Sequence, residues 1–120
     1  MTVSEVLTFV DALKPNAFTQ VQKMLWLSEV EGMVQTDVML RASEQIISYT
    51  NSTDLTAKLL VEPPHDKLYR TYLCAMIDFY NGEYASYQNS MALFNTQMAE
   101  YTNWYARTYA PADTARTQTL

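Results

Sequence analysis

The side chains that could carry acid–base or nucleophilic chemistry are few and lie far apart. His65 is the only histidine and lies between Pro64 and Asp66, where a helix is expected to begin, so a capping or surface role explains it. Cys74 is the only cysteine and has no adjacent histidine or cation to lower its pKa. Its apolar neighbours favour the role of a small buried hydrophobic residue.

The carboxylates show no catalytic or metal-binding spacing either. Glu29 and Glu31 are two residues apart and would point to different sides of a helix, whereas Asp66 and Asp78 are more than three turns apart. A carboxylate-bridged metal site in a helical bundle needs Glu-x-x-His pairs, and the sequence has none. We therefore predict no catalytic, metal-binding or cofactor-binding residue and a protein that is not an enzyme.

The composition of the 120 residues excludes further classes of function. The chain has a formal charge of -5, so it lacks the cationic surface with which proteins hold nucleic acid. Two glycines exclude Gly-rich phosphate-binding loops, and one cysteine excludes an internal disulfide. With no signal-peptide pattern and no run of eighteen apolar residues, we expect no contact with a membrane.

Helical periodicity predicts the elements that position these residues. Capping boxes at Thr2 and Thr19 open helices over about 3–13 and 20–40, and Gly32 makes a break near 32–35 possible. Residues 48–58 are expected to form a loop, preceded by a short turn at 42–47 and followed by a buried extended segment at 59–61. Further helices are predicted over 65–80 and 83–109, joined at Asn81-Gly82. The sequence thus predicts an all-α bundle of one domain, 1–110, whose long last helix forms an antiparallel hairpin with the preceding one, and a flexible tail, 111–120.

The last predicted helix carries the clearest pattern in the chain. Aromatic residues and methionines recur at alternating steps of three and four, which is a heptad seam, and Glu100 is the only charge between Tyr84 and Tyr105. Because interface centres are poor in charge and rich in Tyr, Trp, Met and Phe, we predict contact with another chain here. The alternative is a helix buried within a monomer. The predicted contact residues are Tyr84, Tyr87, Met91, Phe94, Met98, Tyr101, Trp104, Tyr105, Tyr109, Pro111 and Leu120.

Two parts of the chain resemble a known family. The first is the opening VLTFVDALKPNAF with WLSEVEG after it, and the second is the central block LLVEPPHDKLY, YLCAMIDFYNGEY and YQNSMALFN. These stretches are similar to head-tail connectors, or adaptors, of tailed phages and prophages of Gram-positive bacteria. The resemblance covers about residues 3–41 and 59–110 and fails in 42–58.

The resemblance implies a structural virion protein without enzymatic activity. Such connectors are all-helical and form a ring of about twelve subunits between the portal protein and the tail or a second neck protein. DNA passes through the ring without being specifically bound. The protein would then assemble in the host cytoplasm and reside in the virion neck. The alternatives are a small acidic phage protein that regulates or inhibits another protein by binding it, and, more remotely, an enzyme that depends on Cys74 or His65.

Overall fold

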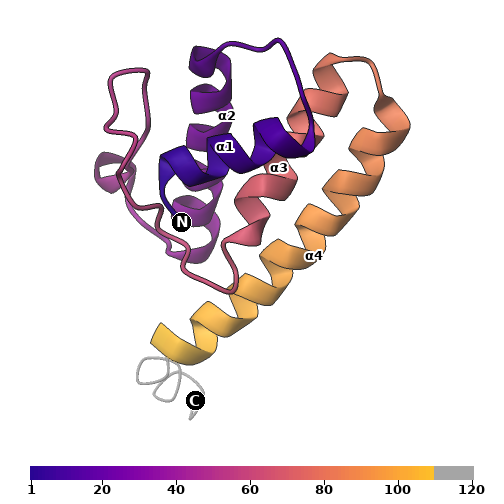
Figure 1. The fold of residues 1–120 in the computed structure, drawn as a ribbon. Helices are drawn as coiled ribbons and strands as arrows, with labels where there is room; N and C mark the ends of the chain where they lie inside the picture. The colour runs from indigo at the N-terminus through magenta and orange to yellow at the C-terminus, as the bar shows by residue number, and fades with distance from the viewer. Residues whose placement is uncertain (110–120) are drawn as a thin grey trace.

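The computed structural model describes residues 1–109, and these form an all-α bundle, as predicted (Figure 1). Its α-helices are α1 (Val3–Leu13), α2 (Gln20–Met33), α3 (Lys67–Tyr80) and α4 (Tyr84–Tyr109). Within the described residues the only β-type pairing is an isolated bridge between Thr2 and Lys58. The predicted tail, 111–120, lies outside the described residues.

Both predicted capping boxes are present at the starts of α1 and α2. The Thr2 side chain accepts a hydrogen bond from the Glu5 amide at 3.2 Å, and the Glu5 carboxylate accepts one from the Thr2 amide at 2.8 Å. Thr19 and Gln22 exchange the same pair at 3.2 and 2.9 Å. Each pair satisfies amides that the first helical turn leaves free, which is why both helices begin where the sequence predicts.

The second helix changes from α-helical to π-helical winding near residues 32–35, where the sequence made a break possible. Regular α2 ends at Met33, and one π-helical segment, η1 (Val34–Val38), replaces the rest of the predicted helix to residue 40. The buried side chain of Gln35 accepts a hydrogen bond from the Ile47 amide at 2.7 Å and donates one to the Ile47 carbonyl at 2.8 Å. Leu40 follows with a left-handed φ of 56°, so the chain turns away from the helix axis there.

The long connection between η1 and α3 contains the predicted loop. A single 3-10 turn, η2 (Ser43–Gln45), interrupts it within the short turn predicted at 42–47. Leu59 and Val61 are buried, as expected for the segment that precedes the two prolines. The third helix begins at residue 67, two residues later than predicted, because the amide of His65 donates to the Glu62 carbonyl in a turn at 3.0 Å.

The hairpin of α3 and α4 is confirmed, and its turn uses the predicted glycine. Gly82 has a φ of 78°, a conformation that side chains with a Cβ rarely adopt. The two helices lie side by side, α2 lies on the side of α3 away from α4, and α1 crosses in front of α3 (Figure 1). With 26 residues against 14, α4 is about 39 Å long and α3 about 21 Å. The C-terminal part of α4 therefore continues beyond α3.

Candidate interaction surfaces

The aromatic seam of α4 belongs mainly to the core of this chain. Phe94 and Tyr101 are 3 % and 2 % exposed, so the structure corrects the prediction that these two side chains form free contact surface. The seam packs on α3, as in the ring contact of Tyr72 with Phe94 at 5.2 Å. Tyr87 is half-buried beside Phe79. Partly buried members that pack against the core are Met91, Met98, Trp104 and Tyr105.

Among the described members of the predicted contact set, only Tyr84 and Tyr109 are exposed. Tyr84 and Tyr109 are 59 % and 60 % exposed, at opposite ends of α4. Pro111 and Leu120 lie outside the described residues. The seam thus explains why α4 folds back on α3, and the opposite face of α4 stays exposed.

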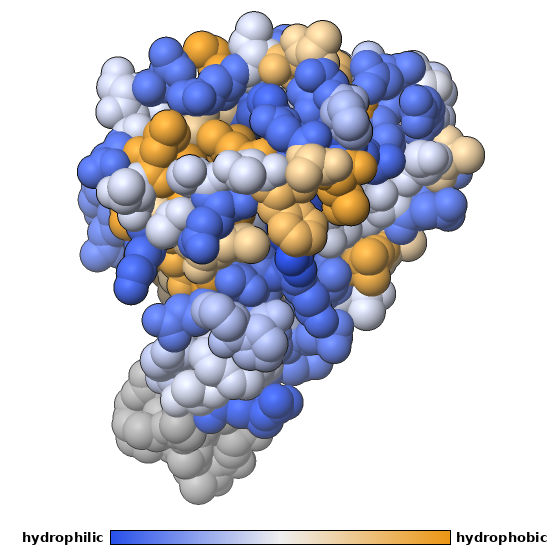
Figure 2. Space-filling model, in the orientation of Figure 1, coloured by the Kyte–Doolittle hydropathy of each residue, from blue (hydrophilic) through white to orange (hydrophobic). Residues whose placement is uncertain are grey.

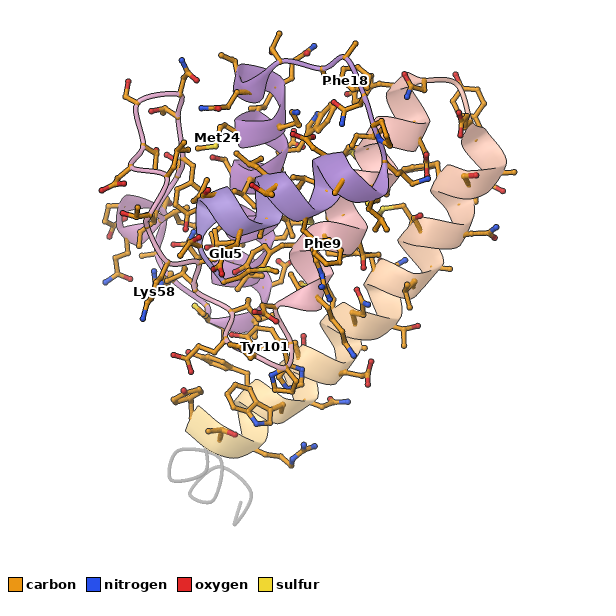
Figure 3. The ribbon with its side chains drawn as sticks, viewed as in Figure 1. Glu5, Phe9, Phe18, Met24, Lys58 and Tyr101 are labelled. Carbon is orange, nitrogen blue, oxygen red and sulfur yellow. The ribbon has the colours of Figure 1, made fainter. Side chains whose placement is uncertain are left out.

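His65 lies in an aromatic cluster near the C-terminal end of α4, where Figure 3 shows Tyr101 beside the connection that enters α3. Its ring centroid is 5.2 Å from that of Trp104 and 5.5 Å from that of Tyr101. The histidine thus packs the start of α3 against α4. The sequence predicted a capping or surface role and gave no sign of these contacts, because the partners are more than thirty residues away.

Neither Cys74 nor the acidic residues of the described chain form a cluster of reactive groups. Cys74 is buried, and burial raises the pKa of its thiol. Within residues 1–109 there is no group of three or more histidine, cysteine or acidic side chains placed to hold a metal ion. Over the same residues, no helix combines the length and the apolar character that a bilayer crossing needs.

A buried carboxylate holds the long connection onto the helices, and sequence reasoning missed it. Glu31 is fully buried and accepts hydrogen bonds from the hydroxyls of Tyr49 and Tyr69, each at 2.6 Å, and from the Leu60 amide at 3.0 Å. Burial, and then the bonds and charge of Glu31, raise the pKa values of both tyrosines. The available signal was the position of Glu31 beside Val30 on the apolar side of α2.

The outer face of α4 is exposed and almost uncharged. Alanines recur on it at every seventh residue, and neutral amides and hydroxyls lie between them. Among its members Glu100 is the only charged residue before Arg107. We call this surface the alanine face; its exposed residues are Ala85, Gln88, Asn89, Ala92, Asn95, Thr96, Ala99, Glu100, Thr102, Asn103 and Ala106.

A groove of about 390 Å³ lies between α1, α3 and α4, next to the alanine face. Three of its residues are large, exposed hydrophobics: Phe9, Leu13 and Leu93 are 41 %, 60 % and 53 % exposed. Figure 2 shows hydrophobic side chains gathered over α1 on this side of the molecule, with strongly hydrophilic ones below them. We call this the basic groove because Lys14, Lys67 and Arg70 also line it, with no carboxylate among the lining residues.

The polar groups of the basic groove are incompletely paired. Lys14 bonds to buried Asp78 at 3.0 Å, which raises the pKa of Lys14. Arg70 lies over the ring of Phe9 at 4.4 Å and, like Lys67, forms no ion pair with any described residue. At the floor, Gln97 is 7 % exposed and its Oε1 has no hydrogen-bond partner within the described chain. The groove therefore offers positive charge and apolar surface.

Comparison of the chain with protein-family models, curated proteins and solved structures gave no match. The candidate surfaces rest on the sequence and on the geometry described above.

Proposed function

We propose that this protein is a non-catalytic assembly protein that joins copies of itself, and that it serves as a head-tail connector of a tailed phage. The observation that carries the proposal is the alanine face of α4. Surface helices usually present charges to water, whereas this face presents none over more than five turns except Glu100. Such a face can be covered by another protein without leaving buried charges unpaired.

The spacing of the alanines suits a second helix as the covering element. Ala85, Ala92, Ala99 and Ala106 follow a strict seven-residue period, so they form one nearly straight line along α4. Their short side chains allow the backbone of a neighbouring helix to approach closely. The polar residues beside them can then hydrogen-bond across the contact, since interfaces between folded subunits are partly polar.

The connector role has a second basis, which is the resemblance of the sequence to phage adaptors. A ring requires that one surface of each copy meet a different surface of the next, and a long rigid helix on the outside of the bundle suits such a contact. The partners would be further copies of the chain, the portal protein and a tail or second neck protein. The negative net charge would let DNA pass without adhering.

Sedimentation velocity and light scattering over a range of concentrations test self-association. We expect species larger than the monomer, and we expect Ala92→Glu and Ala99→Glu to weaken their formation, because each places a charge in the covered face. Ala17→Glu, at an exposed alanine between α1 and α2, is the matched control and should leave association unchanged. A protein that stays monomeric up to about 1 mM, where an interaction of about -4 kcal/mol would be half formed, overturns the proposal and favours a monomeric binding protein.

The connector role has its own test. A pull-down with the portal protein encoded in the same genome should retain the chain. Self-association without portal binding would keep the assembly role and overturn the connector role.

A further inference from the structure

The basic groove has the features of a surface that another molecule covers. Among residues 1–109, Lys67 and Arg70 have no ion-pair partner beside exposed Phe9 and Leu13, and the buried acceptor of Gln97 has no donor. Buried polar groups in folded proteins nearly always have a hydrogen-bond partner. The groove therefore suits an occupant that combines a carboxylate with an apolar side chain.

The same chain exposes a turn with matching chemistry. Leu40 is 80 % exposed, the highest value among its exposed large hydrophobic residues, and its φ of 56° is costly for a residue with a Cβ. Asp37 is exposed, and it lines a surface hollow together with Leu40 and Tyr109. The adjacent cation, Arg41, is turned inward and donates to the Gln35 side chain at 3.0 Å. The 37–40 turn thus presents an apolar side chain with a carboxylate beside it.

We propose that the 37–40 turn of one copy docks into the basic groove of the next copy. Leu40 would enter between Phe9, Leu13 and Leu93, and Asp37 would face Lys67 and Arg70. The inference rests on the proposed self-assembly and names the two surfaces that meet. It accounts for the strained, exposed leucine, because a contact with another copy would compensate the cost of holding it there.

The positions of the two surfaces agree with a ring. The groove lies between α1, α3 and α4, whereas the turn ends η1, so a copy can use its groove toward one neighbour and its turn toward another. Contacts of this heterologous kind form closed rings when the rotation between copies permits closure. The groove also adjoins the alanine face through Leu93 of α4, so both would belong to one side of each subunit.

Three variants test the contact by sedimentation velocity. Lys67→Glu/Arg70→Glu reverses the charge of the groove, and we expect at least a tenfold weaker association. Asp37→Lys should weaken association similarly, and mixing it with the groove variant should restore pairing, since the reversed charges again attract. Lys58→Glu, a charge reversal at an exposed lysine outside the groove, is the control and should have little effect.

The Leu40→Gly variant distinguishes the loss of a contact between copies from a loss of folding stability. Glycine adopts a φ of 56° without strain, so the variant should fold with unchanged or higher thermal stability while association falls about tenfold. Leu25→Ala, which removes a 58 % exposed leucine from α2, is the matched control and should leave association unchanged.

Mixing the Leu40→Gly and Lys67→Glu/Arg70→Glu proteins gives the sharpest outcome. Each has one half of the turn–groove contact intact, so the mixture should associate more strongly than either variant alone. If the wild-type protein associates and these variants associate equally well, the docking of the turn is wrong while self-assembly stands. If the wild-type protein does not associate at all, the proposed function itself fails.

Discussion

At the scale of single residues, Glu31 decides how the irregular half of the chain is held. It accepts from Tyr49 of the connection and Tyr69 of α3, and no cation pairs with it among the described residues. Its charge is balanced by hydrogen-bond donors alone, in the short-distance range typical of charge-assisted bonds. Three donors therefore point at this one carboxylate.

Replacement of Glu31 should therefore be costly even when the shape is kept. In Glu31→Gln the amide nitrogen would face a donor, so we expect the free energy of unfolding to fall by about 2–3 kcal/mol. Glu29→Gln is the matched control, because Glu29 is exposed and only one bond, at 3.2 Å from the Tyr72 hydroxyl, connects it to the fold. Urea denaturation measures both, and equal losses would show that the buried network is not special.

The buried tyrosines also predict how stability depends on pH. Burial raises the pKa values of Tyr49, Tyr69, Tyr72 and Tyr101 above the value of about 10 for an unfolded chain. The folded state then keeps protons that the unfolded state releases, so this contribution to stability is complete below about pH 10 and is lost above it. The raised pKa of Lys14, due to its bond to Asp78, acts in the same direction.

We expect the free energy of unfolding to fall steeply between about pH 10 and pH 11, by up to about 1.4 kcal/mol per pH unit for each buried tyrosine. Urea denaturation at a series of pH values measures the slope. Tyr49→Phe should reduce it, whereas Tyr84→Phe, at an exposed position, should not. If the wild-type protein and both variants show the same slope, the pH dependence does not come from the buried tyrosine.

At the scale of elements, the two glycines have opposite roles. Gly82 adopts a φ of 78° between α3 and α4, whereas Gly32 lies within α2 with helical neighbours. A methyl group added at either position would meet no atom within 4 Å, so packing does not distinguish them. Backbone conformation alone sets the sign of a substitution.

Gly82→Ala should lower the free energy of unfolding by about 1 kcal/mol, because alanine is strained at positive φ. Gly32→Ala should raise it by about 0.5–1 kcal/mol, because alanine restricts the unfolded chain and favours a helix. Thermal unfolding followed by circular dichroism measures both. A gain of stability in Gly82→Ala or a loss in Gly32→Ala would contradict the roles assigned to the two glycines.

At the scale of the whole molecule, charge is distributed unevenly over an acidic protein. The alanine face is neutral, whereas the basic groove holds three of the eight lysines and arginines. Two copies joined through both surfaces would be held by an apolar contact and by an exposed charge contact. These respond differently to salt, because ions screen exposed charges and leave apolar contacts intact.

Raising the salt concentration should therefore weaken self-association of the wild-type protein only in part. The Lys67→Glu/Arg70→Glu variant, whose groove now repels Asp37, should associate most weakly at low salt and should gain affinity as salt is added, because ions screen the repulsion. Sedimentation equilibrium at low and high salt measures both trends. If association of the wild-type protein does not depend on salt, the charged residues of the basic groove do not contribute to self-association.

From the sequence alone one could predict the four α-helices to within a few residues at most ends, their capping boxes, the glycine turn and the buried stretch around Leu59 and Val61. These features depend on local spacing and on residues within four positions of one another, which the sequence displays directly. It also showed that α4 is poor in charge.

Only the tertiary structure decided what each side of α4 does. A heptad seam looks the same whether its partner is α3 or another chain, because the apolar period records burial and not the identity of the covering element. The folded chain covers Phe94 and Tyr101 itself and leaves the alanine face free. Likewise, Glu31 meets Tyr69 and Phe9 meets Arg70 only after distant segments come together, so neither the buried network nor the basic groove could be seen in the sequence.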